Sequence, residues 1–292
     1  MDPQSPMRNR QNVTSQWGED GVIKEIFRRI GVRNSFCVEF GAWDGRHLSN
    51  TWDLWHNQGW SAVLIEGESD RFRTLQAAVA AFPSVQAVCA FVTVAGPDSL
   101  DAILGRCGVP IDLDLLSIDV DGDDYYIFES LAAHQPRVVL IEFNPTVPPK
   151  LDLVQAPGTR FGASVRAVVE LARRKGYQFV GCTVANGVFV RSEEFPSLGV
   201  EEPDLDAEFS PAHLTYVMTS YDGEALLSRQ PTYSVQLTTD AGADYPRPPV
   251  TTGPSSGGVV PVRIRRASNK SRVVRRAVRL IKRQAEHLRN QA

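Results

Sequence analysis

Phe36-Cys37-Val38-Glu39-Phe40-Gly41-Ala42-Trp43-Asp44-Gly45 is the stretch of sequence that decides the fold. Its first five residues are apolar or aromatic apart from Glu39, a composition typical of a buried strand, and the glycines four residues apart predict a turn directly after it. A strand followed by such a turn is typical of the first strand of a doubly wound sheet. Because glycine has no Cβ, the backbone at Gly41 and Gly45 can pass close to a ligand.

The spacing of this turn indicates the kind of ligand. It reads acidic-x-Gly-x-x-x-Gly and lacks the Gly-x-Gly-x-x-Gly spacing of dinucleotide-binding proteins. A pyrophosphate is bound by bare backbone N–H groups at a helix start, whereas a neighbouring carboxylate favours a cationic ligand without phosphate. S-adenosylmethionine, which carries a sulfonium and an amino acid tail, is such a ligand.

Strand-like and helix-like segments alternate on both sides of this stretch. This pattern predicts an α/β fold with a doubly wound, mostly parallel seven-stranded sheet, and the Asn186-Gly187 turn predicts an antiparallel hairpin at its edge. We expect further strands at 61–66, 85–91, 112–119, 138–143, 177–182 and 188–190, and helices at 22–30, 48–58, 70–82, 123–134 and 163–175.

Composition divides the chain into four parts. We expect a flexible N-terminus at 1–14, a catalytic α/β domain at 15–240, a linker rich in Pro, Gly, Ser and Thr at 241–260, and a basic amphipathic extension at 261–292. The extension carries a net charge of +10 and the first 260 residues −13, because the whole chain carries −3. Its apolar positions recur at helical spacing, which favours an anionic membrane surface or an acidic protein as its partner over nucleic acid.

The expected compartment is the cytoplasm, with peripheral membrane attachment through the basic helix as one use of the extension. No run approaches the ~18 apolar residues of a membrane-spanning helix, and the first residues lack the apolar core of a signal peptide. Cysteines are scattered without a Cys-x-x-Cys pair, so we expect free thiols, buried at Cys37, Cys89 and Cys182.

Candidate site residues follow the predicted strands at their carboxyl ends, where open α/β sheets bind ligands. Glu66 ends the second strand at the spacing typical of an acid that binds ribose hydroxyls. Ala90 and Phe91 end the third strand and suit an adenine face. The ends of the fourth and fifth strands carry Asp119, Asp121, Glu142 and Asn144.

Four segments in this order resemble the class I S-adenosylmethionine-dependent methyltransferases: VEFGAWDG (38–45), LIEGES (64–69), LLSIDVDGDDYYIFESL (115–131) and VVLIEFNP (138–145). Three more resemble the FkbM-type methyltransferases: SQWGEDGVIKEIF (15–27), HLSNTWDL (47–54) and GYQFVGCTVANGVFV (176–190). The resemblance implies methyl transfer, usually to a hydroxyl oxygen of a glycan or other secondary metabolite.

The resemblance also implies roles for single residues. Glu66 would hold the ribose hydroxyls, and Asp119 would lie beside the sulfonium and the acceptor. The methionine part of the cofactor would be lined by residues of the first turn, Glu39, Gly41, Ala42 and Gly45.

Two questions about the chemistry stay open at this point. We expect His47 or Asp121 to act as general base toward the acceptor hydroxyl. The less favoured alternative for the acids is a Mg²⁺ site made by Asp119, Asp121 and Asn144, since these oxygen ligands suit that ion; otherwise no metal is expected.

Two rival functions use the same fold. One is a nucleic acid methyltransferase guided by the basic extension, against which the acidic charge of the first 260 residues argues. The other is a non-catalytic protein that keeps the fold for binding, against which the intact set of Gly41, Gly45 and Glu66 argues.

Overall fold

The computed structural model describes residues 4–219, 221, 225–229 and 260–262. The chain forms two units, Met1–Leu214 and Thr215–Ala292. The predicted linker and basic extension lie outside the described residues, apart from Val260–Val262, which pair as β10 with two short strands of the second unit, β8 (Val217–Thr219) and β9 (Ala225–Leu227).

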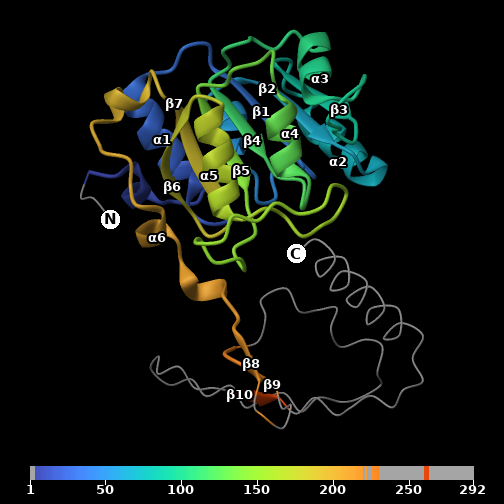
Figure 1. Ribbon diagram of the computed structural model, residues 1–292. Coiled ribbons are helices and arrows are strands. Elements are labelled where there is room, and N and C mark those ends of the chain that lie inside the picture. The colour runs from blue at the N-terminus through green and yellow to red at the C-terminus, as the bar shows by residue number, and fades with distance from the viewer. Residues whose placement is uncertain (1–3, 220, 222–224, 230–259, 263–292) are drawn as a thin grey trace, which may run out of the picture. The chain divides into compact units, whose positions relative to one another are not determined.

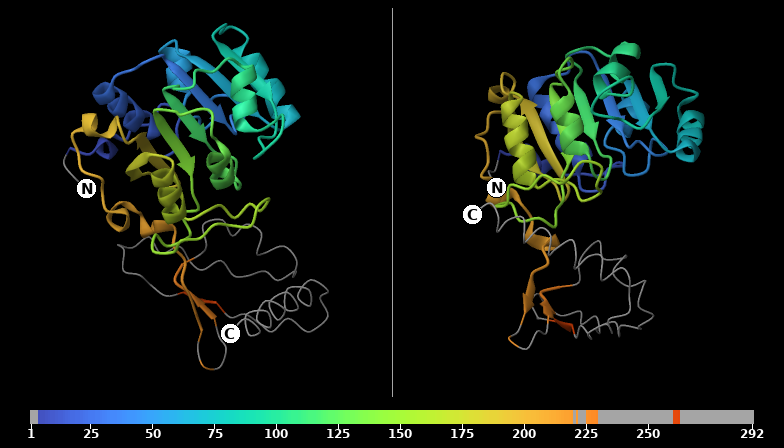
Figure 2. Two further views of the ribbon diagram at one scale, coloured as in Figure 1. Left: turned by 45° about the horizontal axis from the view of Figure 1, so that its top comes forward. Right: turned by 45° about the vertical axis from the view of Figure 1, so that its right-hand side comes forward.

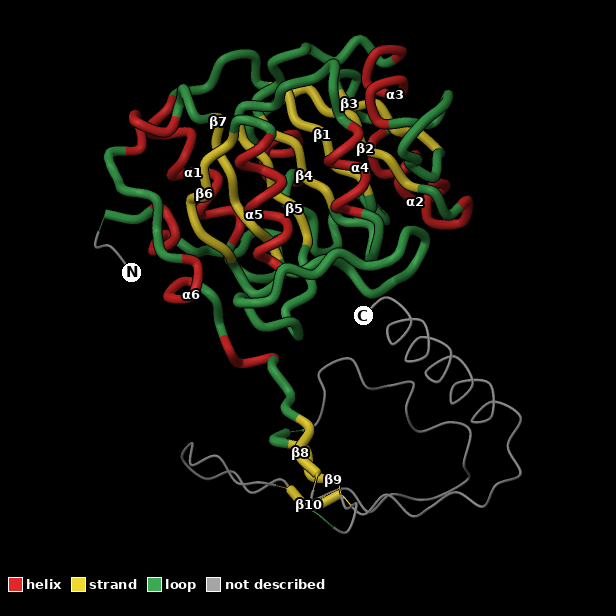
Figure 3. Tube along the Cα trace, in the orientation of Figure 1, coloured by secondary structure: helices red, strands yellow, loops and turns green. Residues whose placement is uncertain are grey.

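A seven-stranded sheet forms the centre of the first unit, in the order β3-β2-β1-β4-β5-β7-β6 (Figures 1 and 3). Strands β1 to β5 are parallel, and β7 runs antiparallel between β5 and β6. This is the class I methyltransferase fold, and the predicted fold class is confirmed. The strands are β1 (Phe36–Phe40), β2 (Ser61–Glu66), β3 (Val85–Cys89), β4 (Leu115–Ile118), β5 (Val138–Glu142), β6 (Tyr177–Cys182) and β7 (Asn186–Arg191).

Helices cover both faces of this sheet (Figures 1 and 2). The apolar residues of α1 (Glu19–Ile30) and α2 (Ser69–Val79) pack on one face. The other face is covered by α3 (Leu100–Arg106), α4 (Asp124–Ser130) and α5 (Val165–Arg174). Because both faces are buried, the central strands are mainly apolar, and their polar residues Glu39 and Ser117 are buried as well.

The short elements after β7 complete the first unit. They are η3 (Phe195–Leu198), α6 (Leu205–Glu208) and η4 (Pro211–His213). Among the described residues, no helix is long and apolar enough to cross a membrane.

The N-terminal segment, predicted from the sequence to be flexible at 1–14, is described from residue 4 onward and packs against the first unit. A 3₁₀ helix, η1 (Pro6–Asn9), places Met7 in the core against Gly181 of β6. The Asp20 carboxylate accepts hydrogen bonds from the backbone N–H groups of residues 13–15 at 2.7–3.0 Å. These contacts anchor the segment to the start of α1.

The helix expected at 48–58 is wrong for its first half. Residues 46–52 form a loop, and only a π-helical turn, η2 (Asp53–Asn57), follows. The loop is drawn away from helical geometry because its polar groups bond to Glu39 of β1, and Leu48 takes a positive φ of 57°. Such a long-range contact overrides local helix propensity.

The cysteines are free thiols, as expected, but only two of the three predicted buried ones are buried. Cys37 and Cys182 lie in strands with a covered face, whereas Cys89 is exposed because it ends β3 at the edge of the sheet.

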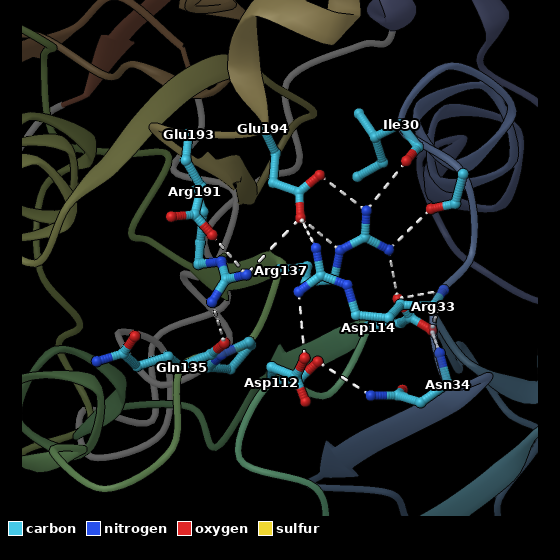
Figure 4. Close-up of polar contacts among 12 residues, drawn as sticks. Ile30, Arg33, Asn34, Asp112, Asp114, Gln135, Arg137, Arg191, Glu193 and Glu194 are labelled. Carbon is cyan, nitrogen blue, oxygen red and sulfur yellow. Dashed lines mark hydrogen bonds and ion pairs between the residues drawn. The ribbon is translucent and has the colours of Figure 1, made fainter.

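Buried charges are neutralised at the amino-terminal edge of the sheet (Figure 4). The Arg137 guanidinium donates to Asp114 Oδ1 at 2.6 Å and to both carboxylate oxygens of Glu194 at 2.6 and 2.8 Å. It also donates to the carbonyl oxygens of Ile30 and Gly31, which are the last carbonyls of α1 and its C-cap. One arginine therefore joins the starts of β4 and β5, the segment after β7 and the end of α1.

Candidate functional site

Polar side chains gather at the opposite, carboxyl-terminal edge of the sheet. The ends of β1, β2, β4 and β5 lie there, together with the turn between β6 and β7 and the N-terminus of α1. Of the four non-glycine residues with positive φ in the described part of the chain, three lie in loops of this edge: Trp43, Leu48 and Asp121. Strained backbone of this kind is concentrated at functional sites.

Glu66 is held in one orientation at the end of β2. Its Oε2 accepts a hydrogen bond from the backbone N–H of Trp43 at 2.9 Å, and its Oε1 accepts one from the N–H of Glu68 at 2.7 Å. A carboxylate has about four acceptor positions, so each oxygen retains one for a further donor. The two oxygens can therefore receive a pair of neighbouring hydroxyl groups.

Phe91 lies against Gly67, the residue that follows Glu66. Its ring covers Gly67 so closely that a Cβ at that position would collide with three ring atoms, yet 66% of the residue remains exposed. Ala90 precedes it and donates its backbone N–H to the carbonyl of Glu66 at 3.2 Å. The ends of β2 and β3 thus present an acid and an open aromatic ring side by side.

Glu39 fixes the loop that follows the first turn. Its carboxylate accepts hydrogen bonds from Ser49 Oγ at 2.5 Å, the Asn50 backbone N–H at 2.7 Å and Thr51 Oγ1 at 2.8 Å. Burial raises the pKa of Glu39, and these three donors oppose that shift. Glu39 therefore holds the loop at residues 49–51 in place, and hydrogen bonds within the protein occupy most of its acceptor positions.

The glycines of the first turn are required by contacts within the protein. A Cβ at Gly41, where φ is +76°, would collide with the backbone oxygen of Asp119 at the end of β4. A Cβ at Gly45 would crowd the side chain of Leu75. Ala42 between them is buried and donates its N–H to the Ile65 carbonyl at 3.1 Å. The turn thus packs β1 tightly against both of its neighbours.

Three carboxylates meet at the ends of β4 and β5. Asp119, Asp121 and Glu142 each offer an oxygen, and the three oxygens lie within 4.8 Å of one another. Burial and then the neighbouring Asp124 and Asp121 carboxylates raise the pKa of Asp119 to about 8. Burial, followed by Asp119, Asp124 and Asp121, raises the pKa of Glu142 to about 10. We call these three residues the acidic cluster.

Asp124 shapes the loop that carries Asp121. Its buried carboxylate accepts from the N–H groups of Val120 at 2.8 Å and Gly122 at 2.9 Å. Burial raises its pKa to about 6, while these backbone donors lower it. The loop turns back on itself through Asp121, whose φ is 55°, and this directs the chain so that Asp121 reaches Asp119.

Asn144, which the sequence offers as a third oxygen ligand of a less favoured metal site, has its side chain engaged in the loop after β5. Its Nδ2 donates to the Phe161 carbonyl at 2.6 Å, and its Oδ1 accepts from the N–H and the hydroxyl of Thr146. The side chain is engaged in the loop after β5, and Glu142 takes the third position.

His47 lies in a different group of side chains from the acidic cluster. Its ring makes an edge contact with Trp43 at 4.7 Å between centroids, and the Arg71 guanidinium lies 4.5 Å from the centre of the Trp43 ring. The backbone N–H of Trp43 is the one that Glu66 accepts. The structure thus places His47 near the Glu66 side of the edge, whereas Asp121 lies with the acids.

Asn186 is a site residue that the sequence does not single out. It begins β7 opposite Glu142, and its Nδ2 donates to Glu19 Oε1 at 3.1 Å. Glu19 also accepts from Thr183 Oγ1 at 2.6 Å. In the sequence, Asn186 belongs to an Asn-Gly hairpin turn, which fully accounts for the residue type there.

Comparison with known proteins gives distant similarities only. No protein-family model matches the chain, and no curated protein matches it in sequence. The N-terminal domain of EvdMO1 with SAH bound is similar at a TM-score of 0.40 and 12% identity, over 59% of this chain and 80% of that one. A SAM-dependent methyltransferase from Aquifex aeolicus is similar at 0.36 and 10%, over 65% and 98%.

TrmK of M. capricolum in complex with S-adenosyl-homocysteine is similar at a TM-score of 0.35 and 13% identity, over 57% of this chain and 65% of that one. Similarities at this level carry no argument about the activity of the chain. The fold is identified by the strand order.

Proposed function

We propose that the chain is an S-adenosylmethionine-dependent methyltransferase of the FkbM type that methylates a hydroxyl oxygen of a glycan or secondary metabolite. The observation that carries this proposal is the Glu66 carboxylate, fixed by two backbone donors beside the open Phe91 ring. An acid and an aromatic face at adjacent strand ends form the pair of groups that an adenosine requires.

The residues present fit this cofactor. The two unused acceptor positions of Glu66 suit the 2′- and 3′-hydroxyls of a ribose, which lie side by side. The exposed face of Phe91 suits an adenine ring, whose binding would bury apolar surface now in water. Acidic groups at the ends of β1 and β4 favour a cation rather than a phosphate.

When bound, S-adenosylmethionine supplies a methyl group on a positively charged sulfur. A neighbouring positive charge lowers the pKa of a carboxylic acid, so Asp119 would be ionised beside it. Asp121 is exposed at the same edge and is placed to accept the proton of an acceptor hydroxyl. His47, which lies with Trp43, is the less suitable base.

Calorimetric titration of the full chain with S-adenosylmethionine and S-adenosylhomocysteine tests the cofactor. Glu66→Gln should weaken binding of both by about 10-fold, because an amide replaces one of the two acceptor oxygens. Glu201→Gln is the matched control, since Glu201 is exposed and remote from these contacts. If the folded wild-type chain binds neither compound, the proposal is wrong.

A panel of acceptors tests the reaction. S-adenosylhomocysteine formation would be followed with mono- and oligosaccharides, with phenolic metabolites and with single- and double-stranded nucleic acids. Turnover of a hydroxyl compound supports the proposal, and turnover of nucleic acid alone supports the rival enzyme. Cofactor binding without turnover of any class supports a non-catalytic binding protein.

For the basic extension at 261–292 we propose contact with an anionic membrane surface. The support is its charge of +10 and its helical apolar spacing. Binding of the full chain to vesicles containing phosphatidylserine should weaken with salt and be lost on truncation after Gly258. Binding that survives truncation would contradict this proposal.

A further inference from the structure

We propose that the acidic cluster and Asn186 bind a divalent cation of the oxygen-preferring type, Mg²⁺ or Ca²⁺. The donors would be one carboxylate oxygen each from Asp119, Asp121 and Glu142, and the side-chain oxygen of Asn186. Binding of the ion is independent of the proposed function; its use in catalysis rests on that function.

The spacing of the carboxylates fits such an ion. Their ligand oxygens all lie within 4.8 Å of one another. Two ligands on opposite sides of Ca²⁺ are about 4.8 Å apart, and on Mg²⁺ about 4.2 Å, given their usual metal–oxygen distances. The three oxygens can therefore share one coordination sphere with small side-chain adjustments. Carboxylate and carbonyl oxygens are also the donor types that these ions prefer.

Asn186 supplies the independent observation that points to a ligand. It is 7% exposed, and its Oδ1 has no hydrogen-bond partner. The bond from Nδ2 to the Glu19 carboxylate fixes the orientation of the amide, since the reverse orientation would set two oxygens against each other. Asn186 is the direct cross-strand partner of Glu142, and such partners project from the same face with their Cβ atoms about 5 Å apart.

The acidic cluster has no basic side chain paired with it in the described part of the protein. Arg137 neutralises Asp114 and Glu194 at the other edge of the sheet. No lysine, arginine or histidine among the described residues forms an ion pair with Asp119, Asp121 or Glu142.

Four protein donors would leave coordination positions open on the ion. Mg²⁺ binds about six ligands, so four protein oxygens leave about two positions. Water or a hydroxyl oxygen of the proposed acceptor would fill these positions. A bound cation lowers the pKa of a coordinated hydroxyl and would prepare it for methylation.

Titration of the full chain with Mn²⁺, followed by electron paramagnetic resonance, tests the site. We expect saturable binding that Mg²⁺ or Ca²⁺ displaces, and the stronger competitor identifies the ion. Asp121→Asn should weaken Mn²⁺ binding about 10-fold or more, in line with what changes around metal sites cost. Asp121 is exposed, so this variant should fold. Asp123→Asn, two residues away in the same loop and bonded instead to the Gly158 N–H, should bind as the wild type does.

Mn²⁺ binding by Asn186→Ala tests the fourth donor, and circular dichroism checks that this variant folds. The proposal is wrong if Mn²⁺ does not bind saturably, or if the wild type and Asp121→Asn bind it equally. Bound protons would then balance the negative charge of the acidic cluster. S-adenosylhomocysteine binding is measured on the same samples. Cofactor binding without Mn²⁺ binding refutes only this site, and Mn²⁺ binding without cofactor binding refutes only the proposed function.

Discussion

Replacing Arg137 by methionine should lower the free energy of unfolding by about 3–5 kcal/mol, the range measured when one partner of a buried ion pair is removed. The arginine side chain is 3% exposed, and that of Asp114 is fully buried. Methionine fills much of the same volume, so the change removes charge and hydrogen bonds more than it removes packing.

The surrounding groups place the expected effect near the lower limit, about 3 kcal/mol. Asp114 still accepts from the three backbone N–H groups of residues 33–35. Glu194 keeps Arg33 at 3.0 Å. The carbonyls of Ile30 and Gly31 also lose their donors, but both bonds are only partly buried, so water can replace much of what is lost.

Urea denaturation followed by circular dichroism measures the change, provided that the m-value stays constant. Arg28→Met is the matched control, because Arg28 is 67% exposed and its pair with Glu25 should contribute less than about 1 kcal/mol. S-adenosylhomocysteine affinity should not change in either variant. A loss below about 1 kcal/mol for Arg137→Met would refute the view that this network holds the amino-terminal edge together.

Three further changes test the carboxyl-terminal edge. Because burial raises the pKa of Glu142 to about 10, the folded state keeps a proton that the unfolded state releases near pH 4.3. Without divalent ions, the free energy of unfolding should therefore fall as the pH rises from about 4.3 to about 10. Urea titrations at pH 5, 7 and 9 measure this dependence, which Glu142→Gln should flatten. Gly41→Ala should lower the melting temperature much more than Gly59→Ala, since both have positive φ but only Gly41 meets a backbone oxygen; equal shifts would contradict this. Phe91→Ala should weaken S-adenosylhomocysteine binding about 10-fold in calorimetry while the melting temperature stays unchanged, as base–aromatic stacking is worth ~1–3 kcal/mol and the ring is mostly exposed.

The sheet could be predicted from the sequence because its strands are buried on both faces. Strands β2 and β6 have the predicted bounds, since a mainly apolar run ends where the chain leaves the core. The loop at 46–52 could not be predicted in this way. Its conformation depends on Glu39, a residue of another element, and nothing in the local pattern records that contact.

For the site, the sequence predicted acids at the ends of the strands, but it did not predict which side chains and backbone groups lie next to them. Which of Glu142 and Asn144 joins Asp119 depends on the loop after β5, where Thr146 and Phe161 engage the Asn144 side chain. The hairpin partner Asn186 was missed because strand register is a three-dimensional property. The donors to Glu66 are two backbone N–H groups, which every residue type except proline can supply, so the sequence does not reveal them.

The position of β7 between β5 and β6 limits the order in which the sheet can assemble while the protein is synthesised. As the chain leaves the ribosome, β1 to β5 can pair in succession, but β6 emerges before the strand that separates it from β5. The sheet therefore closes only after residue 191 has emerged, and with it the contact of Glu19 with Asn186. We expect nascent chains that have not yet reached that point to expose the edge of β5, and to depend on chaperones until β7 arrives.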